Sequence, residues 1–351
     1  MQVDHIIIGQ GVSGTMLSYH LVKRGKRVMV IDKSVPYSAS KVASGVINPV
    51  TGRRVVSTWM IDELLPFSWQ AYEELEEELG VSIISQKDIL SFHANEQMKQ
   101  AFYDKLEENE AYVEVVQDEE AYKELFHFTY GIGKVTPVYL VELQNLITAW
   151  RKRLVEQDSL LDAYFDWSKC TVDEKGVKYE GIEAKSIILC NGVQGNDDPY
   201  FKRLPYAMTK GEALVVRIPN LSAANIYKQG YNIVPWKDDL FWVGSSFDRD
   251  YNDVLPSESF KTQVKTQLDK WLKLPYEFVA HIASERAGTI ERRPFVGMHP
   301  IHTNVGVFNG MGTKGCSLAP YFANQFADHL VKGTAIDEAA NVLRFRKILE
   351  R

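Results

Sequence analysis

The sequence DHIIIGQGVSGTMLSYHLVKRGKRVMVID, residues 4–32, decides the fold of this chain. Residues 5–8 are mostly isoleucine, which is typical of a buried parallel strand. Helical periodicity follows up to Gly25, and residues 28–31 form a second buried strand. This order of strand, helix and strand predicts a βαβ unit at the start of an α/β protein.

Glycines between the first strand and the helix have the spacing G-x-G-x-x-G. Gly9 permits the tight turn, Gly11 lets the backbone approach a pyrophosphate, and Gly14 lets the helix pack close to the strand. The helix N-terminus offers unpaired N–H groups and a positive dipole to phosphates. Asp32 ends the second strand and is placed to accept hydrogen bonds from a ribose. A chance glycine turn is the alternative, but the complete unit predicts a Rossmann-like site that favours FAD or NAD over NADP.

Composition points to one globular protein of two intertwined domains. The chain has 351 residues, 45% of them hydrophobic and 25% charged, with a net charge of −6. No long basic run is present, so we expect no nucleic-acid partner. No apolar run is long enough to span a membrane, and the N-terminus enters a strand at once, so we expect no signal peptide. The three cysteines predict reduced thiols, a cytoplasmic protein and no metal site.

A loop rich in small residues follows the second strand, at residues 33–54. It is too long for a simple connector, which favours a functional role. Ser38, Ser44 and Gly45 are candidates to contact phosphate or sugar oxygens. Arg53 and Arg54 are candidates to reach an anionic group, although adjacent arginines are more often solvated.

Periodicity predicts the remaining elements. We expect a turn at residues 130–134, a helix from residue 138 to 154 and a buried strand at 185–192. Further helices are expected at 61–80, 96–108, 119–125, 257–274 and up to 331, and strands at 81–94, 163–179, 204–217, 232–246 and 305–308.

A second glycine-rich junction between strand and helix contains Gly310, Gly312 and Gly315. Its distance from the first junction in the sequence predicts that both ends of the chain build one nucleotide-binding domain. The predicted fold class is α/β, with a Rossmann-like FAD-binding domain and an interleaved α+β substrate domain on a large mixed sheet. We expect residues 1–85, 135–204 and 286–351 in the first domain and residues 86–134 and 205–285 in the second.

Several motifs occur in an order that resembles the D-amino-acid oxidase, glycine oxidase and sarcosine oxidase family of flavoproteins. The resemblance covers nearly the whole chain and implies FAD, a split FAD-binding domain of the glutathione-reductase type, and oxidation of a C–N bond by hydride transfer to flavin N5. The motifs are IIIGQGVSG with Asp32, Ala43-Ser44-Gly45, Val135-Thr136-Pro137 before a helix, IILCNG, MTKGEAL, YNIVPWKDDLFWVGSS, RRPFVGMHP and FNGMGTKG.

The resemblance also implies which residues contact the cofactor. No cysteine stands where some relatives bind flavin covalently, so non-covalent FAD is expected, with Cys316 packed beneath the second glycine turn. The implied cofactor-binding residues are Gly9, Gly11, Val12, Ser13, Gly14, Asp32, Lys33, Ser38, Ser44, Gly45, Gly192, Gly310, Gly312, Thr313, Lys314 and Gly315.

Substrate binding is where the sequence departs from the family. Lys314 follows the glycine turn, as does a lysine that holds the substrate carboxylate in sarcosine oxidases, and Arg53 or Arg54 follows the serine-rich loop. The segment G-x-R-P, which carries another carboxylate-binding arginine, is shortened here. Arg286, Arg292 or Arg293 remains open as its replacement, and a structural ion pair with Glu285 or Glu291 is the alternative. Trp242 stands near the position of an oxygen-activating lysine.

The function implied is FAD-dependent oxidation of a small amine or amino acid, with O2 or another compound as electron acceptor. Tyr231 and Trp236 are candidates to line the pocket, although aromatic residues on such strands more often belong to the core. Two other functions remain open: trimming of carboxymethylaminomethyl groups on tRNA wobble uridine, and a flavin-binding electron-transfer subunit. The acidic charge disfavours the tRNA function.

Overall fold

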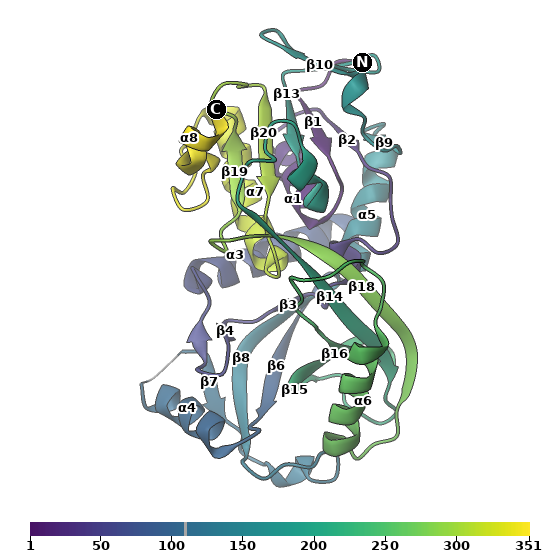
Figure 1. The fold of residues 1–351 in the computed structure, drawn as a ribbon, viewed down its shortest axis with the longest axis vertical. Helices are drawn as coiled ribbons and strands as arrows, with labels where there is room; N and C mark the ends of the chain where they lie inside the picture. Colours follow the sequence, from purple (N-terminus) through teal and green to yellow (C-terminus); the bar gives the residue numbers. More distant parts are fainter. Residues whose placement is uncertain (109–110) are drawn as a thin grey trace.

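The computed structural model describes residues 1–108 and 111–351. They form an upper and a lower half, and the long strands β14 (Tyr206–Arg217) and β18 (Glu277–Thr289) run from the lower half to the upper half (Figure 1). Both chain ends lie at the far end of the upper half. Within the described residues, no helix has the length and apolar character needed to cross a membrane.

The upper half is built on a six-stranded sheet with the order β19-β20-β13-β1-β2-β9. All neighbours are parallel except β19 and β20, and β1 lies between β13 and β2 with a continuous register. Every residue of β1 and β2 is buried, as expected for strands covered on both faces. The strands are β1 (His5–Ile8), β2 (Val28–Ile31), β9 (Leu160–Leu161), β13 (Ser186–Leu189), β19 (Phe295–Met298) and β20 (Val305–Asn309).

The upper half contains the helices α1 (Val12–Lys23), α3 (Ile61–Leu79), α5 (Leu143–Glu156) and α7 (Gly315–Lys332). Helix α1 is buried on nearly all sides, whereas α3 and α5 bury one face each. Trp150 on α5 is fully buried against the ring of Tyr19 on α1. Its indole N–H donates to Ser18 Oγ at 2.7 Å, so the polar atom of this buried ring is satisfied. This contact fixes α5 beside the glycine-rich start of α1.

The lower half is built on a nine-stranded mixed sheet with the order β18-β14-β17-β16-β15-β6-β8-β3, and β7 pairs with β8. Helix α6 (Glu258–Trp271) packs on this sheet around the buried rings of Phe92, Phe126 and Trp271. The strands are β3 (Val46–Ile47), β6 (Ile84–Phe92), β7 (Val113–Val115), β8 (Ile132–Val141), β14 (Tyr206–Arg217), β15 (Asn225–Gln229), β16 (Tyr231–Lys237), β17 (Leu240–Gly244) and β18 (Glu277–Thr289).

Smaller elements complete the fold. They are the helices α2 (Ala39–Val42), α4 (Glu96–Glu107) and α8 (Arg346–Leu349), the hairpin β4 (Val50–Thr51) with β5 (Val56–Ser57), the sheet β10 (Cys170–Asp173), β11 (Gly176–Tyr179) and β12 (Ile182–Ala184), and the 3-10 turns Glu120–Tyr122, Trp167–Lys169, Gly192–Asp197 and Val342–Phe345.

The predicted fold class is confirmed, but one helix begins later than the sequence pattern indicated. Helix α5 begins at Leu143, whereas Val138 and Leu140 lie in β8 together with the motif at residues 135–137. The error arose because Val138 and Leu140 alternate along a strand, yet their spacing also continues the apolar stripe of the helix. The predicted turn at 130–134 likewise ends before Ile132, where β8 begins.

Three expected domain boundaries fall inside strands. The boundary between residues 85 and 86 divides β6, the one between 134 and 135 divides β8, and the one between 285 and 286 divides β18. Residues on both sides of each boundary pair in the nine-stranded sheet, because strand pairing continues through them. The division into two domains stays a prediction, and we propose that these boundaries lie at the ends of β6, β8 and β18.

An ion pair between α1 and α7 predicts a stability change at low pH. Arg24 and Lys332 both hydrogen-bond to Asp328 and lower the pKa of its carboxyl group to about 2. We expect Arg24→Met to lower the free energy of unfolding by about 1–2 kcal/mol at neutral pH. The ion pair's contribution to the free energy of unfolding is complete above the ordinary carboxyl pKa of 3.8 and is lost as pH falls towards 2. Urea unfolding at several pH values measures it, and an undiminished difference at pH 2 would contradict the assignment.

Candidate functional site

A cavity of about 510 Å³ lies at the carboxyl ends of β1, β2 and β13 and continues along β18. This is the edge at which open parallel sheets bind ligands. The residues predicted from sequence that line it are Gly9, Gly11, Val12, Ser13, Asp32, Lys33, Ser38, Ser44, Gly192, Gly312, Thr313 and Gly315. The structure therefore brings both glycine junctions and the serine-rich loop to one cavity.

The first glycine turn is shaped by close backbone contacts. Gly9 has φ +94°, and a Cβ there would lie 2.6 Å from the carbonyl oxygen of Cys190. A Cβ on Gly14 would lie 1.9 Å from the carbonyl oxygen of Gly9, so only glycine lets α1 approach β1 this closely. Gly14 does not line the cavity, and its role is this close packing.

The start of α1 is open towards the cavity. Gly11 occupies the N-cap position and has no side chain to cap the helix. The N–H of Val12 donates to Ser40 Oγ at 3.0 Å, which ties α1 to the loop after β2. A helix N-terminus whose N-cap residue is glycine is a suitable cradle for phosphate groups, so this part of the site fits the pyrophosphate of a dinucleotide.

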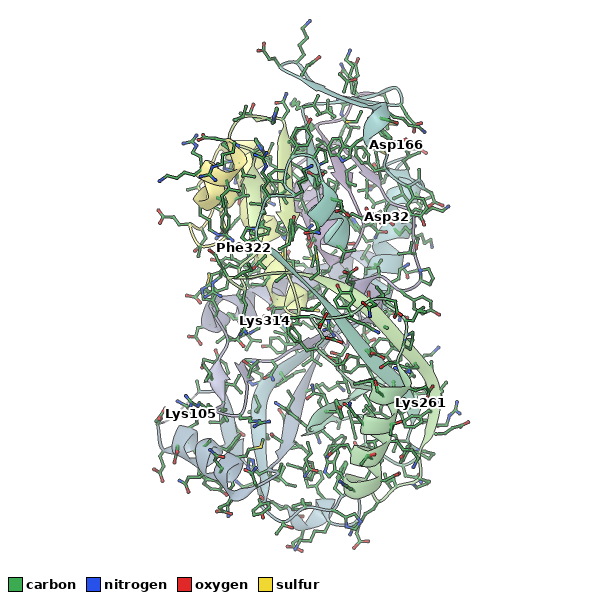
Figure 2. The ribbon with its side chains drawn as sticks, in the orientation of Figure 1. Asp32, Lys105, Asp166, Lys261, Lys314 and Phe322 are labelled. Carbon is green, nitrogen blue, oxygen red and sulfur yellow. The ribbon has the colours of Figure 1, made fainter. Side chains whose placement is uncertain are left out.

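Asp32 is held at the end of β2 by groups from two elements. Its Oδ1 accepts from the N–H of Gln10 at 2.9 Å, and its Oδ2 accepts from Arg151 Nη1 at 2.8 Å. Arg151 lies on α5 and also binds Asp162 at 3.0 Å. Sequence reasoning missed Arg151 because no motif surrounds it and only the tertiary fold brings α5 beside β2. Figure 2 shows Asp32 in the upper half.

Two contacts hold the serine-rich loop against the large sheet. The indole N–H of Trp242 donates to the carbonyl oxygen of Val42 at 2.9 Å, and Ser284 Oγ donates to the carbonyl oxygen of Tyr37 at 2.8 Å. Trp242 also lines the cavity. Gly45 lies outside the lining; a Cβ there would be 2.0 Å from the carbonyl oxygen of Val141.

The second glycine junction meets the first at the start of α7. A Cβ on Gly315 would lie 3.1 Å from Val12 Cγ1, so the two helix N-termini are neighbours. The N–H of Gly312 donates to the carbonyl oxygen of Ala287 at 2.9 Å, which joins this turn to β18. Gly310 does not line the cavity. A Cβ added to Gly310 would lie 2.6 Å from Cγ2 of Thr289, so a side chain at this position would clash.

Lys314 points away from the cavity lining. Its Nζ donates to Thr58 Oγ1 at 3.0 Å, and Figure 2 places it where the two halves meet. Burial, together with the charges of Arg292 and Arg293, lowers the pKa of Lys314 to about 8. The guanidinium of Arg293 stacks 3.9 Å above the ring of Trp59.

Arg53 and Arg54 are exposed at the tip of the β4–β5 hairpin and do not line the cavity. The structure thus places these two candidates for an anionic group outside the cavity that contains the glycine junctions, and their role stays a prediction. Cys316 lies directly after the second glycine turn, where it is buried and lines the cavity; burial raises the pKa of its thiol to about 12. A thiol in this environment is unreactive.

The arginines around the shortened segment differ in their partners. Glu291 pairs with Arg344 at 3.1 Å, and Glu285 accepts a hydrogen bond from Tyr251, so neither forms the ion pair considered from sequence. Arg286 lines the cavity. Ile290, in the segment that has lost the family's arginine, is 70% exposed.

Tyr231 and Trp236 lie outside the lining of the main cavity. The Tyr231 ring packs on Phe260 of α6 with the centroids 5.6 Å apart, so it belongs to the core below the sheet. Trp236 borders a separate hollow of about 310 Å³ beside Ser44.

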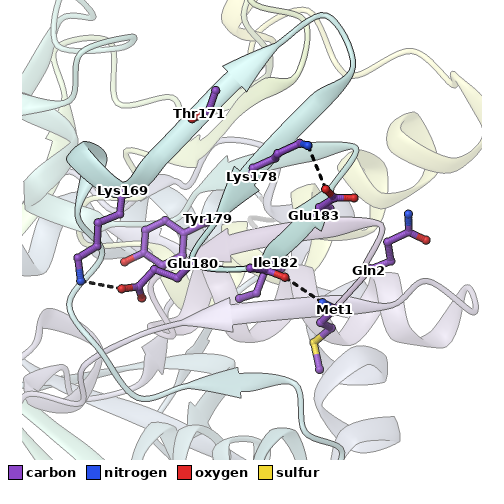
Figure 3. A pocket seen from close by; sticks show the side chains of 10 residues that line it. Met1, Gln2, Lys169, Thr171, Lys178, Tyr179, Glu180, Ile182 and Glu183 are labelled. Atoms are coloured by element: carbon purple, nitrogen blue, oxygen red, sulfur yellow. Dashed lines mark hydrogen bonds and ion pairs between the residues drawn. The ribbon is translucent and has the colours of Figure 1, made fainter.

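A further concavity of about 460 Å³ lies beside the sheet β10–β12 (Figure 3). Its charged side chains satisfy one another: Lys169 binds Glu180 at 2.7 Å and Lys178 binds Glu183 at 3.0 Å. The amino terminus donates to the carbonyl oxygen of Gly181. In residues 1–108 and 111–351, no group of three His, Cys, Asp or Glu side chains is arranged to hold a metal ion.

Fold and cavity together define a dinucleotide-binding protein of the Rossmann-like class with a second sheet over the site. Residues 4–329 match the family model described as FAD dependent oxidoreductase, DAO. The chain belongs to this family and is an FAD-dependent oxidoreductase.

Solved structures with the same fold share little sequence with this chain. Glycine oxidase from Geobacillus kaustophilus has a TM-score of 0.76 and 20% identity, covering 96% of this chain and 97% of that one. L-proline dehydrogenase from P. horikoshii has a TM-score of 0.78 and 17% identity, and the match covers 99% of this chain and 98% of that one. Iminodiacetate oxidase from Chelativorans sp. BNC1 has a TM-score of 0.74 and 17% identity, and the match covers 96% of this chain and 98% of that one. These likenesses establish the fold.

A short sequence match links the chain to the uncharacterized oxidoreductase YurR of Bacillus subtilis (strain 168). The identity is 39% over 56 residues, which is 16% of this chain and 15% of that protein's length. A match of this extent carries no information on substrate.

Proposed function

We propose that this protein oxidises the C–N bond of a small amine or amino acid with non-covalently bound FAD. The observation that carries the proposal is the convergence of Asp32 and both glycine junctions on one cavity beside the large sheet. FAD bound in this cavity would supply the hydride acceptor that the oxidation needs. Glycine oxidase, iminodiacetate oxidase and proline dehydrogenase share the fold, which supports a substrate of this class.

The residues proposed to hold the cofactor divide between its two ends. Asp32, kept in place by Arg151, would bind the adenosine ribose, and the start of α1 would bind the pyrophosphate. At the other end the N-terminus of α7 would stabilise negative charge on the reduced ring. Gly14, Gly45 and Gly310 would act indirectly, because each lets its backbone pack against a neighbouring group that a side chain would push away. Lys33, Ser38, Ser44, Gly192, Gly312, Thr313 and Gly315 would complete the contacts.

The chain's part in the reaction is to position an amine and exclude water. A substrate bound as the neutral amine needs no side-chain base, and we propose none. The sheet face that carries Trp242 and Ser284 would cover the reacting atoms. We propose O2 or another small acceptor for the electrons and a cytoplasmic location.

Among the cations proposed for the substrate's acidic group, Lys314 lies outside the cavity lining, so it would act through its charge beside the second glycine turn. It directly precedes α7 and is partly buried, whereas Arg53 and Arg54 are exposed and Arg293 is stacked on Trp59. Binding by these three arginines stays a prediction and would require movement of the β4–β5 hairpin or of Arg293.

The lowered pKa of Lys314 predicts a pH dependence of anion binding. Its ammonium group loses its proton as pH rises through about 8, so affinity for a carboxylate should fall above that value. Lys314→Arg should keep the affinity constant up to pH 10, because a guanidinium stays charged. Titration of the flavin spectrum with a carboxylate at several pH values measures this effect. Equal pH profiles for the two proteins would remove Lys314 from the site.

Two measurements on the purified protein test the proposed function. Heat denaturation should release all the flavin, and mass spectrometry should identify it as FAD. An oxygen electrode and a dye-reduction assay should then detect turnover of at least one small amine or amino acid. Release of FMN, or flavin that stays attached to the chain, would contradict the cofactor assignment.

A further inference from the structure

Helix α7 contains a proline close to its N-terminus. The helix begins at Gly315, and Pro320 lies inside it. Proline has no backbone N–H, so residue 320 cannot donate the usual helical hydrogen bond to the carbonyl oxygen of Cys316, four residues earlier. The proline ring also crowds that carbonyl group and pushes it out of line. Helix α7 therefore starts with one hydrogen bond missing, at a residue that lines the cavity.

Tyr72 supplies the missing donor from another helix. It lies on α3, which packs against α7, and its hydroxyl group donates to the carbonyl oxygen of Cys316 at 2.9 Å. The Tyr72 side chain is fully buried. A buried carbonyl group that loses its donor is costly, because burial has already removed its contact with water. The Tyr72 hydroxyl thus takes the place of the N–H that Pro320 lacks.

A second hydroxyl group on α3 reaches the next carbonyl of α7. Ser68 precedes Tyr72 by one helical turn and is also fully buried. Its Oγ donates to the carbonyl oxygen of Ser317 at 3.3 Å. Because residues four apart lie on the same face of a helix, α3 presents both hydroxyl groups to consecutive carbonyl groups of α7. Polar contacts, and not packing alone, therefore fix the start of α7 against α3.

The peptide group that Tyr72 holds is part of the first turn of α7. It joins the carbonyl of Cys316 to the N–H of Ser317, and this N–H donates to the carbonyl oxygen of Lys314 at 3.1 Å. A hydrogen bond at one end of a peptide group orients the whole group and strengthens the bond at its other end. The helix dipole acts on a nearby charge mainly through its first turn. The alignment of this peptide group therefore affects any negative charge placed before α7.

We propose that Tyr72 is a positioning residue for the flavin. By completing the hydrogen bond that Pro320 removes, it keeps the first turn of α7 aligned to stabilise negative charge on the reduced ring. Tyr72 does not line the cavity and acts through Cys316, which does. The proposal rests on the proposed function for the placement of the flavin ring before α7, but it requires no particular amine.

Tyr72→Phe tests the proposal, because it removes one oxygen atom and leaves the ring in the core. The FAD-loaded protein is reduced at equilibrium beside a reference dye, which gives the two-electron potential of the flavin. We expect the preference for reduced over oxidised flavin to fall about three- to tenfold. For a two-electron couple, this is a potential about 14–30 mV more negative. An unchanged potential would contradict the proposal.

Tyr227→Phe is the matched control. The Tyr227 side chain is 1% exposed, and its hydroxyl donates to the carbonyl oxygen of Ser222 at 2.9 Å in the lower half. This variant loses the same kind of hydrogen bond, so it should lower the free energy of unfolding without changing the potential. Equal shifts of the potential in the two variants would assign the effect to general destabilisation and overturn the role of Tyr72.

Pro320→Ala provides a rescue. It restores an N–H at the position from which a helix residue donates to the carbonyl oxygen of Cys316. Tyr72→Phe should therefore leave the potential unchanged when it is introduced into Pro320→Ala. An equal shift with and without Pro320→Ala would show that the missing helical hydrogen bond is not the cause, and the proposal would be wrong.

Two further outcomes are informative. If Tyr72→Phe alone does not retain FAD, the double variant with Pro320→Ala should retain it, and loss of FAD from both would contradict the proposal. If the potential shifts and is rescued as expected but no amine reduces the flavin, the role of Tyr72 stands and the proposed function fails.

Discussion

Replacing Gly11 with valine is expected to abolish retention of FAD. A Cβ at this position would already lie 3.0 Å from Ser40 Oγ, and the two methyl groups of valine would enter the space beside the N-terminus of α1. We expect the dissociation constant for FAD to rise on the order of 100-fold, since overpacking and lost phosphate contacts act together. Flavin absorbance per polypeptide after gel filtration measures it.

A second glycine serves as the control for this change. Gly181 is in the left-handed region with φ +82°, a Cβ added there would have no atom within 4 Å, and the residue is far in sequence from both junctions. Gly181→Asn should retain FAD, because asparagine tolerates this conformation. A yellow, fully loaded Gly11→Val protein would contradict the placement of the cofactor at this turn.

Replacing Phe92 with alanine is expected to have the largest effect on stability. Its ring is fully buried and contacts the rings of Phe126, Phe128 and Trp271 beneath the large sheet. Removing a buried phenylalanine costs about 3–5 kcal/mol of the free energy of unfolding. Urea unfolding followed by tryptophan fluorescence measures the loss.

The matched control is Phe247→Ala. Phe247 is 57% exposed, so its removal should change the free energy of unfolding by about 0.5 kcal/mol or less. Equal losses in the two variants would contradict the assignment of Phe92 to a packed core. If Phe92→Ala loses stability but still binds FAD, the lower half can be destabilised without affecting the FAD site in the upper half.

The sequence predicted those parts of the site that depend on local backbone geometry. The turn at Gly9 and the close helix at Gly14 were identifiable because each requires glycine at a fixed spacing, and the same spacing predicts that Gly11 lies against a phosphate. Asp32 was identifiable because it ends the next strand. Contacts around the cavity that depend on tertiary packing have no motif in the sequence by which they could be recognised. Arg151 holds Asp32 from α5, and Trp242 holds the serine-rich loop from the large sheet.

The cations illustrate the same limit. Arg53 and Arg54 lie close in sequence to the serine-rich loop, but the β4–β5 hairpin carries them to the surface. Arg286 was left open between a structural ion pair and a site residue, and only the register of β14 with β18 shows that it lies over Gly211. Residue type indicated the possible chemistry, while strand pairing decided the position.

Anaerobic mixing of the FAD-loaded protein with amino acids, N-methyl amino acids and simple amines tests the central claim most directly. We predict that at least one small amine with an acidic group bleaches the flavin within a single turnover. Readmitted air should then restore the colour if O2 is the acceptor, and an artificial dye should restore it otherwise. A protein whose flavin is reduced by dithionite but by no compound of the panel would contradict amine oxidation as its function.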